Sequence, residues 1–131
     1  MHATNTAVPF VANAGQTDAQ VAYTAQLFAG ALFVTHRGEL VYSLPAVATP
    51  AGGRTGWTLT ERFIDGHPQP VGIGPTGTRV SFLRGGDRSA WQRDIETFAA
   101  LELGEVWKGV GVELRAHGAN VEKVFTVAPS V

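Results

Sequence analysis

The chain has 131 residues, of which 44% are hydrophobic and 16% charged, with a formal net charge of −1 and no cysteine. This length fits one domain, and this composition fits a packed core, not a disordered segment. A charge so close to zero gives no electrostatic basis for binding nucleic acid. The missing thiols exclude disulfides, thiolate zinc sites and cysteine nucleophiles, and no apolar run is long enough for membrane insertion.

In chain order, apolar residues recur mostly at every second position, which predicts strands. The first is expected at 21–25, although 17–28 also fits a helix capped by Asp18. A hairpin over 31–44 follows. Later strands are expected at 57–63, 71–74, 78–85, 97–103, 110–118 and 120–129.

Glycine and proline separate these runs and indicate turns. We expect an exposed, mobile loop over 45–56 and turns at 75–77, 87–92 and 104–109. The pattern predicts one all-β domain over 1–131, with minimal helix. It would be an antiparallel β-sandwich or a partly open barrel of about nine short strands. Residues 1–12 are expected to form an extended N-terminal arm.

Several spaced segments carry a family likeness. The opening "PFVANAGQTDAQVAYTA", the hairpin "ALFVTHRGELVYSL", the stretch 79–114 and the ending "NVEKVFTVAPSV" occur in that order. Together they resemble the N-terminal domain of bacterial SBBP-repeat (β-propeller repeat) proteins. The matching positions include Phe10, Asn13, Gly15, Gln16, Asp18, Val21, Tyr23, Gly86, Asp87, Trp91, Trp107 and Gly109. The chain departs from the family turn Gly-Ile-Asp-Leu, because residues 109–112 are Gly-Val-Gly-Val.

The resemblance implies an extracellular or cell-surface location and a domain of unknown function that precedes propeller-type or Ig-like repeats. The chain would then be an excised N-terminal module. Its start, "MHATNTAVPF", has no basic region and no long apolar core, so it is not expected to be an intact secretion signal. The implied partners are the following domains of a longer parent chain or other surface proteins.

The polar opening motif is interpreted as structural. Asn13, Gly15, Gln16 and Asp18 suit a turn, since Asn and Gly tolerate left-handed backbone and the polar side chains can satisfy backbone groups. A ligand or calcium role is the alternative. Trp107 and Gly109 occupy family positions that also look structural.

No catalytic or cofactor motif is evident. The histidines at 2, 36, 67 and 117 lack metal-binding spacing, and no calcium-loop motif occurs. No G-x-S-x-G elbow is present, and "GIGPTG" lacks the ending of a phosphate-binding loop. The sequence therefore predicts a protein that is not an enzyme and has no metal or cofactor.

Aromatic residues are the best candidates for a ligand or partner surface. Trp57, Tyr42 and Trp91 form the candidate set. Packing in the core or at a sheet edge is the alternative for each tryptophan. Trp57 is favoured among them, because it opens a strand after a glycine-rich segment in a region that matches the family poorly.

The favoured function is a non-catalytic structural or adhesive module that mediates protein–protein or inter-domain contacts. One alternative is a carbohydrate-binding module that uses surface aromatics. A small hydrolase would need a deep pocket with paired acidic groups. Another alternative is a homo-oligomer in which residues 1–12 add as a strand to a neighbour's sheet.

Overall fold

The computed structural model describes residues 8–48, 50–83, 86 and 92–129. These residues form nine strands and no helix, which confirms the all-β prediction. The strands are β1 (Phe10–Ala12), β2 (Val21–Gln26), β3 (Ala31–Thr35), β4 (Leu40–Ala48), β5 (Arg54–Glu61), β6 (Val71–Phe82), β7 (Gln92–Trp107), β8 (Val110–His117) and β9 (Asn120–Val127). No described helix could therefore cross a membrane.

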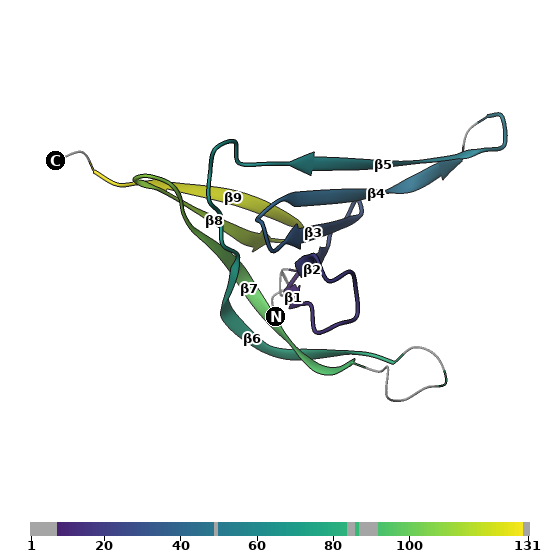
Figure 1. Ribbon diagram of the computed structural model, residues 1–131. Coiled ribbons are helices and arrows are strands. Elements are labelled where there is room, and N and C mark those ends of the chain that lie inside the picture. The colour runs from purple at the N-terminus through teal and green to yellow at the C-terminus, as the bar shows by residue number, and fades with distance from the viewer. Residues whose placement is uncertain (1–7, 49, 84–85, 87–91, 130–131) are drawn as a thin grey trace, which may run out of the picture.

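All strands belong to one antiparallel sheet with the order β5-β4-β3-β2-β1-β7-β8-β9. The sheet curls into a half-barrel, so the partly open barrel is the correct alternative (Figure 1). Phe98 on β7 pairs with Phe10 on β1 and with Pro75 on β6, so β1 and β6 lie on opposite edges of β7. The free edges of the described sheet are therefore β5, β6 and β9.

The core occupies the inner face of the curl. Side chains alternate between the two faces of a strand, and the register places Leu32 beside Tyr42 and Val34 beside Leu40. Their inner face meets that of β7 and β8. The buried cluster contains Phe10, Ala25, Leu32, Val34, Leu40, Leu101, Leu103, Val106, Val112 and Leu114.

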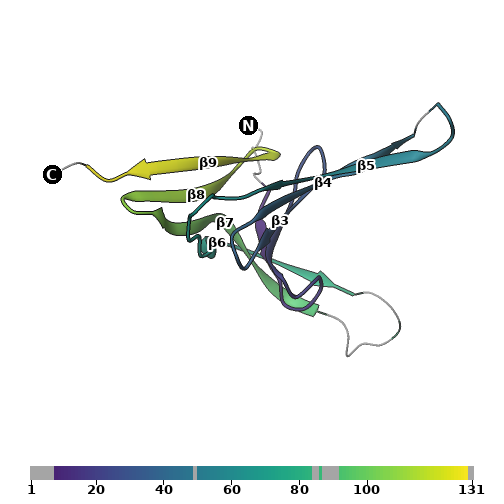
Figure 2. The same cartoon turned by 45° about the horizontal axis from the view of Figure 1, so that its top comes forward.

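The connection after β5 crosses to the far edge of β7. The amide of His67 donates to the carbonyl of Val106 at 2.8 Å, and that of Gln69 donates to Leu103 at 2.9 Å. This crossing packs Phe63 against the core. The β4–β5 hairpin, by contrast, projects from the body of the half-barrel in both views (Figures 1 and 2).

The predicted loop over 45–56 is largely wrong. Strand β4 continues to Ala48 and β5 begins at Arg54, with Val47 paired to Thr55 beyond a register shift. The chain reverses only around 50–53. A bulge let the ladder continue where proline and glycine suggested that it stopped.

The turns predicted at 75–77 and 104–109 are also misplaced. Strand β6 runs through Gly77, and β7 continues through Gly104 to Trp107. Both glycines have positive φ, +80° and +76°, and both lie at register shifts. Glycine there absorbs a bulge inside a strand and does not end it. Most of the turn predicted at 87–92 lies outside the described residues.

The N-terminal prediction needs correction. Residues Phe10–Ala12 form β1, which pairs with both β2 and β7 of the same chain. Phe10 is fully buried. This segment is therefore part of the chain's own sheet and is not a free arm, while residues 1–7 lie outside the described part. The helix alternative over 17–28 is wrong, because Val21–Gln26 is a strand.

Candidate interaction surface

An exposed apolar strip lies on the β4–β5 hairpin. It consists of Leu44, Trp57 and Leu59, whose exposed fractions are 39%, 64% and 58%. Leu44 pairs with Trp57, and Tyr42 pairs with Leu59. By strand alternation these side chains share the face that carries the buried Leu40. The strip therefore lies on the same face of the sheet as the core, but outside the part of that face that is buried.

The strip ends at a polar contact that joins two edges of the sheet. The Glu61 carboxylate on β5 accepts a hydrogen bond from Nζ of Lys123 on β9. It also interacts with the hydroxyl of Tyr42. The candidate residue Tyr42 is half-buried, and its hydroxyl is already hydrogen-bonded to Glu61.

Burial of the ring, with the hydrogen bond to the Glu61 carboxylate, raises the pKa of Tyr42 well above its usual range. Burial also opposes ionisation of Glu61. The hydrogen bonds from Lys123 and Tyr42, with the Lys123 charge, outweigh it and hold the pKa of Glu61 below its usual value. Glu61 is therefore a carboxylate at neutral pH, and Tyr42 a neutral hydroxyl.

The opposite edge strand carries a second exposed apolar pair. Phe125 and Val127 on β9 are 51% and 70% exposed. Phe125 pairs with the buried Val112, so it shares the inner face with Lys123. Apolar residues on β5 and β9 thus adjoin the Glu61–Lys123 contact from both edges.

The opening motif forms a closed hydrogen-bond network. The side-chain amide of Asn13 donates to the carbonyls of Asp18 and Val21, each at 2.8 Å. Its Oδ1 accepts from the amide of Gly15 at 2.9 Å, where φ is +111°. The Gln16 side chain bridges the amide of Ala14 and the carbonyl of Ala12. These groups hold the turn between β1 and β2.

Trp107 and Gly109 lie at the other end of the half-barrel. The Trp107 ring packs edge-on against Phe63, with ring centres 5.6 Å apart, and its Nε1 donates to the carbonyl of Ile64 at 2.8 Å. Gly109 has φ of +79°, and its amide donates to the Glu105 carboxylate at 2.7 Å. These contacts anchor the crossing connection and the β7–β8 turn.

A depression of about 450 Å³ lies next to this turn. Glycines 104, 109 and 111 and the carboxylates of Glu102, Glu105 and Glu113 line it. Glu105 accepts from Gly109, and Glu113 pairs with Arg115. Among the described residues, no group of three or more His, Cys, Asp or Glu is arranged to hold a metal ion.

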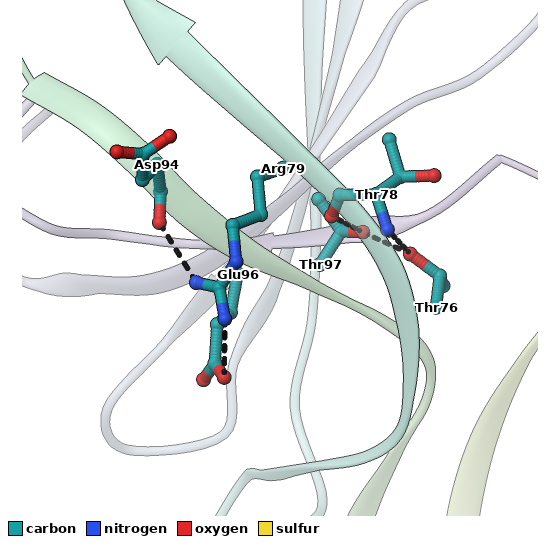
Figure 3. A network of polar contacts seen from close by, with 6 residues as sticks. All are labelled: Thr76, Thr78, Arg79, Asp94, Glu96 and Thr97. Carbon is teal, nitrogen blue, oxygen red and sulfur yellow. Dashed lines mark hydrogen bonds and ion pairs between the residues drawn. The ribbon is translucent and has the colours of Figure 1, made fainter.

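A network of polar contacts connects the paired strands β6 and β7 (Figure 3). Thr97, almost fully buried, donates to the carbonyl of Thr78 at 2.8 Å and contacts the hydroxyl of Thr76. Arg79 donates to the Asp94 carbonyl at 3.0 Å and pairs with Glu96 at 3.6 Å. Asp94 has φ of +54°. The network spans a register shift between the strands, and we interpret it as structural.

The structure brings only part of the predicted surface together. Tyr42 and Trp57 share a face on neighbouring strands, whereas Trp91 lies outside the described residues. No sequence pattern pointed to Leu44 or to the Glu61–Lys123 contact. The alternation of Trp57 and Leu59 with threonines indicated that β5 has one apolar face. No pattern showed that this apolar face extends beyond the buried core.

Comparison with known proteins identifies the family. The model of a domain of unknown function, DUF7948, matches residues 10–131, so the chain belongs to this family. Neither the curated proteins nor the solved structures yield a match.

Proposed function

We propose that this domain is a non-catalytic interaction module that docks a protein partner on the strip Leu44–Trp57–Leu59. The observation that carries the proposal is the exposure of this strip on a hairpin that projects from the body (Figure 2). A large aromatic flanked by aliphatic side chains is typical of an interface centre, where Trp is enriched.

The wider setting is part of the same proposal. The spaced segments that resemble SBBP-repeat proteins support an extracellular bacterial multi-domain protein as the parent. The docked partner would then be a following domain or another surface protein.

Carbohydrate binding is the weaker alternative. A sugar site needs polar groups beside its stacking ring. Two polar groups on this face, the Tyr42 hydroxyl and the Glu61 carboxylate, bind each other, and Glu61 also binds Lys123. Leu44, which pairs with Trp57, and Leu59, the next residue on this face toward Glu61, are aliphatic.

The test compares three purified proteins: wild type, Trp57→Ala and Thr60→Ala. Thr60 is exposed on the same strand but faces the other side, so it is a matched control. Each protein is probed for self-association, for binding to the other domains of the parent chain, and against a glycan array. We expect protein binding that Trp57→Ala weakens about 30-fold, the loss of a typical hot spot, and that Thr60→Ala preserves. Glycan binding lost in Trp57→Ala, without any protein binding, would overturn the proposal.

A further inference from the structure

The three free edges of the sheet differ in how they are protected. Strand β6 carries Pro75 between glycines of positive φ, and β9 carries Glu122 and Lys123 in its middle. Proline, bulges and charges are the usual devices that stop an edge from pairing with another chain. The β5 run 55–60, Thr-Gly-Trp-Thr-Leu-Thr, has no proline and no charge, and the bulge of the β4–β5 ladder has its extra residue on β4.

This run is also accessible. Trp57 and Leu59 are exposed on one face, and Thr58 and Thr60 on the other. In the described part of the chain, β5 pairs only with β4. Every second residue of an edge strand directs its backbone N–H and C=O outward, so β5 presents unpaired groups to solvent.

We propose that the partner is a second copy of this chain, whose β5 pairs antiparallel with β5 about a two-fold axis at Thr58. This inference rests on the proposed function, because it names the occupant of the same surface. In this register Trp57 lies opposite the second copy's Leu59, and Leu59 lies opposite its Trp57. On this face of the joined sheet, a row of neighbouring side chains then runs across the strands from Leu44 and Trp57 of one copy to Leu59 and Tyr42 of the other.

Self-complementarity selects both the copy and the register. If the register shifted by one residue, Trp57 and Leu59 of one copy would lie on one face of the joined sheet, and Trp57 and Leu59 of the other copy would lie on the opposite face. A shift by two in one direction sets Trp57 against Glu61, and in the other it sets Leu59 against Thr55. Only pairing about Thr58 places both Trp57 and Leu59 opposite apolar residues.

The absence of cysteine provides a direct test. A single Thr58→Cys variant would place two thiols on the axis, with Cα atoms about 4.5–5.5 Å apart, within the range of a disulfide. Thr60→Cys is the matched control, on the same face of the same strand. In the dimer its two copies are offset by four residues, about 13 Å, which is too far to bridge.

Under mild oxidation by diamide, we expect Thr58→Cys to form a covalent dimer of twice the 13.8 kDa chain mass, and Thr60→Cys to stay a monomer. Sedimentation of wild type should show reversible dimers. Thr58→Lys and Thr58→Glu should each be monomeric, and their mixture should dimerise again. Equal cross-linking at both positions, or a wild type that is monomeric at every concentration, would overturn the inference.

The two proposals fail separately. A monomeric wild type that still binds another protein through Trp57 refutes only self-pairing. A β5 dimer in which Trp57→Ala has no effect refutes docking through the apolar strip. Glycan binding through Trp57 refutes both when no dimer forms.

Discussion

Glu61 and Lys123 form an ion pair between β5 and β9, the first and last strands in the order of the sheet, although 62 residues separate them in the chain. The contact joins the two edges of the half-barrel at the point where the core ends and the exposed strip begins. It therefore marks the boundary between the part of the inner face that stabilises the fold and the exposed part on which we propose that a partner docks.

The ion pair predicts a pH-dependent stability. Glu61 has a lowered pKa in the folded protein, so its contribution is complete above its ordinary value of 4.5 and is lost as pH falls through the folded value. Because the pair is partly exposed and screened, Glu61→Gln should lower the free energy of unfolding by only about 0.5–1 kcal/mol at pH 7. The difference between variant and wild type should disappear in acid.

Urea unfolding at several pH values measures this difference. Lys123→Met is the partner variant, and the double variant should show that the two losses are not additive. A deficit of Glu61→Gln that persists unchanged at pH 3 would contradict the assignment to the ionised pair.

Asn13 is expected to be important for stability. Its side chain donates to two backbone carbonyls and accepts from the Gly15 amide, so Asn13→Ala should cost about 2 kcal/mol by urea unfolding. Asn13→Asp should be no better, because a carboxylate would face the same carbonyls. A rise in the melting temperature on adding Ca²⁺ would instead support the ligand role and contradict the structural interpretation.

Trp107 is expected to anchor the crossing connection through ring packing and one hydrogen bond. Trp107→Ala should lower the free energy of unfolding by about 3 kcal/mol. Trp107→Phe keeps a ring against Phe63 but loses the bond to Ile64, which predicts a loss of about 1 kcal/mol. Equal stability of wild type and the alanine variant would contradict the packing role and make Trp107 a candidate for the surface site.

Phe10 tests the correction at the N-terminus. Since its ring is fully buried, Phe10→Ala should destabilise the fold by about 3–5 kcal/mol, measured by thermal and urea unfolding. A variant as stable as wild type but altered in oligomeric state would mean that β1 exchanges between chains.

Local patterns predicted the parts of the fold that depend on local pairing. The alternation over 31–44 identified the β3–β4 hairpin, and Val21 and Tyr23 identified β2 despite the competing helix pattern. The lengths of β6 and β7 were missed, because Gly77 and Gly104 form bulges inside strands where glycine usually signals a turn.

The candidate surface was only partly predictable for a different reason. Trp57 was the favoured surface candidate because it opens a predicted strand after a glycine-rich segment, and the structure shows that its side chain is exposed on the strip. That β5 is a free edge depends on the order of strands distant in sequence, which no local pattern contains. The contact between Glu61 and Lys123 depends on the same non-local closure of the sheet.

The central claim is that the strip around Trp57 is covered by protein in the assembled state. The most direct measurement replaces Trp57 with the photo-crosslinker benzoyl-phenylalanine in the protein inside cells that produce it, with Glu122, which is exposed on the outer face of β9, replaced as the control. We predict that irradiation gives a defined protein adduct at position 57, identified by mass spectrometry as a second copy of the chain, and none at position 122. No adduct at 57, or the same adducts at both positions, would contradict the account.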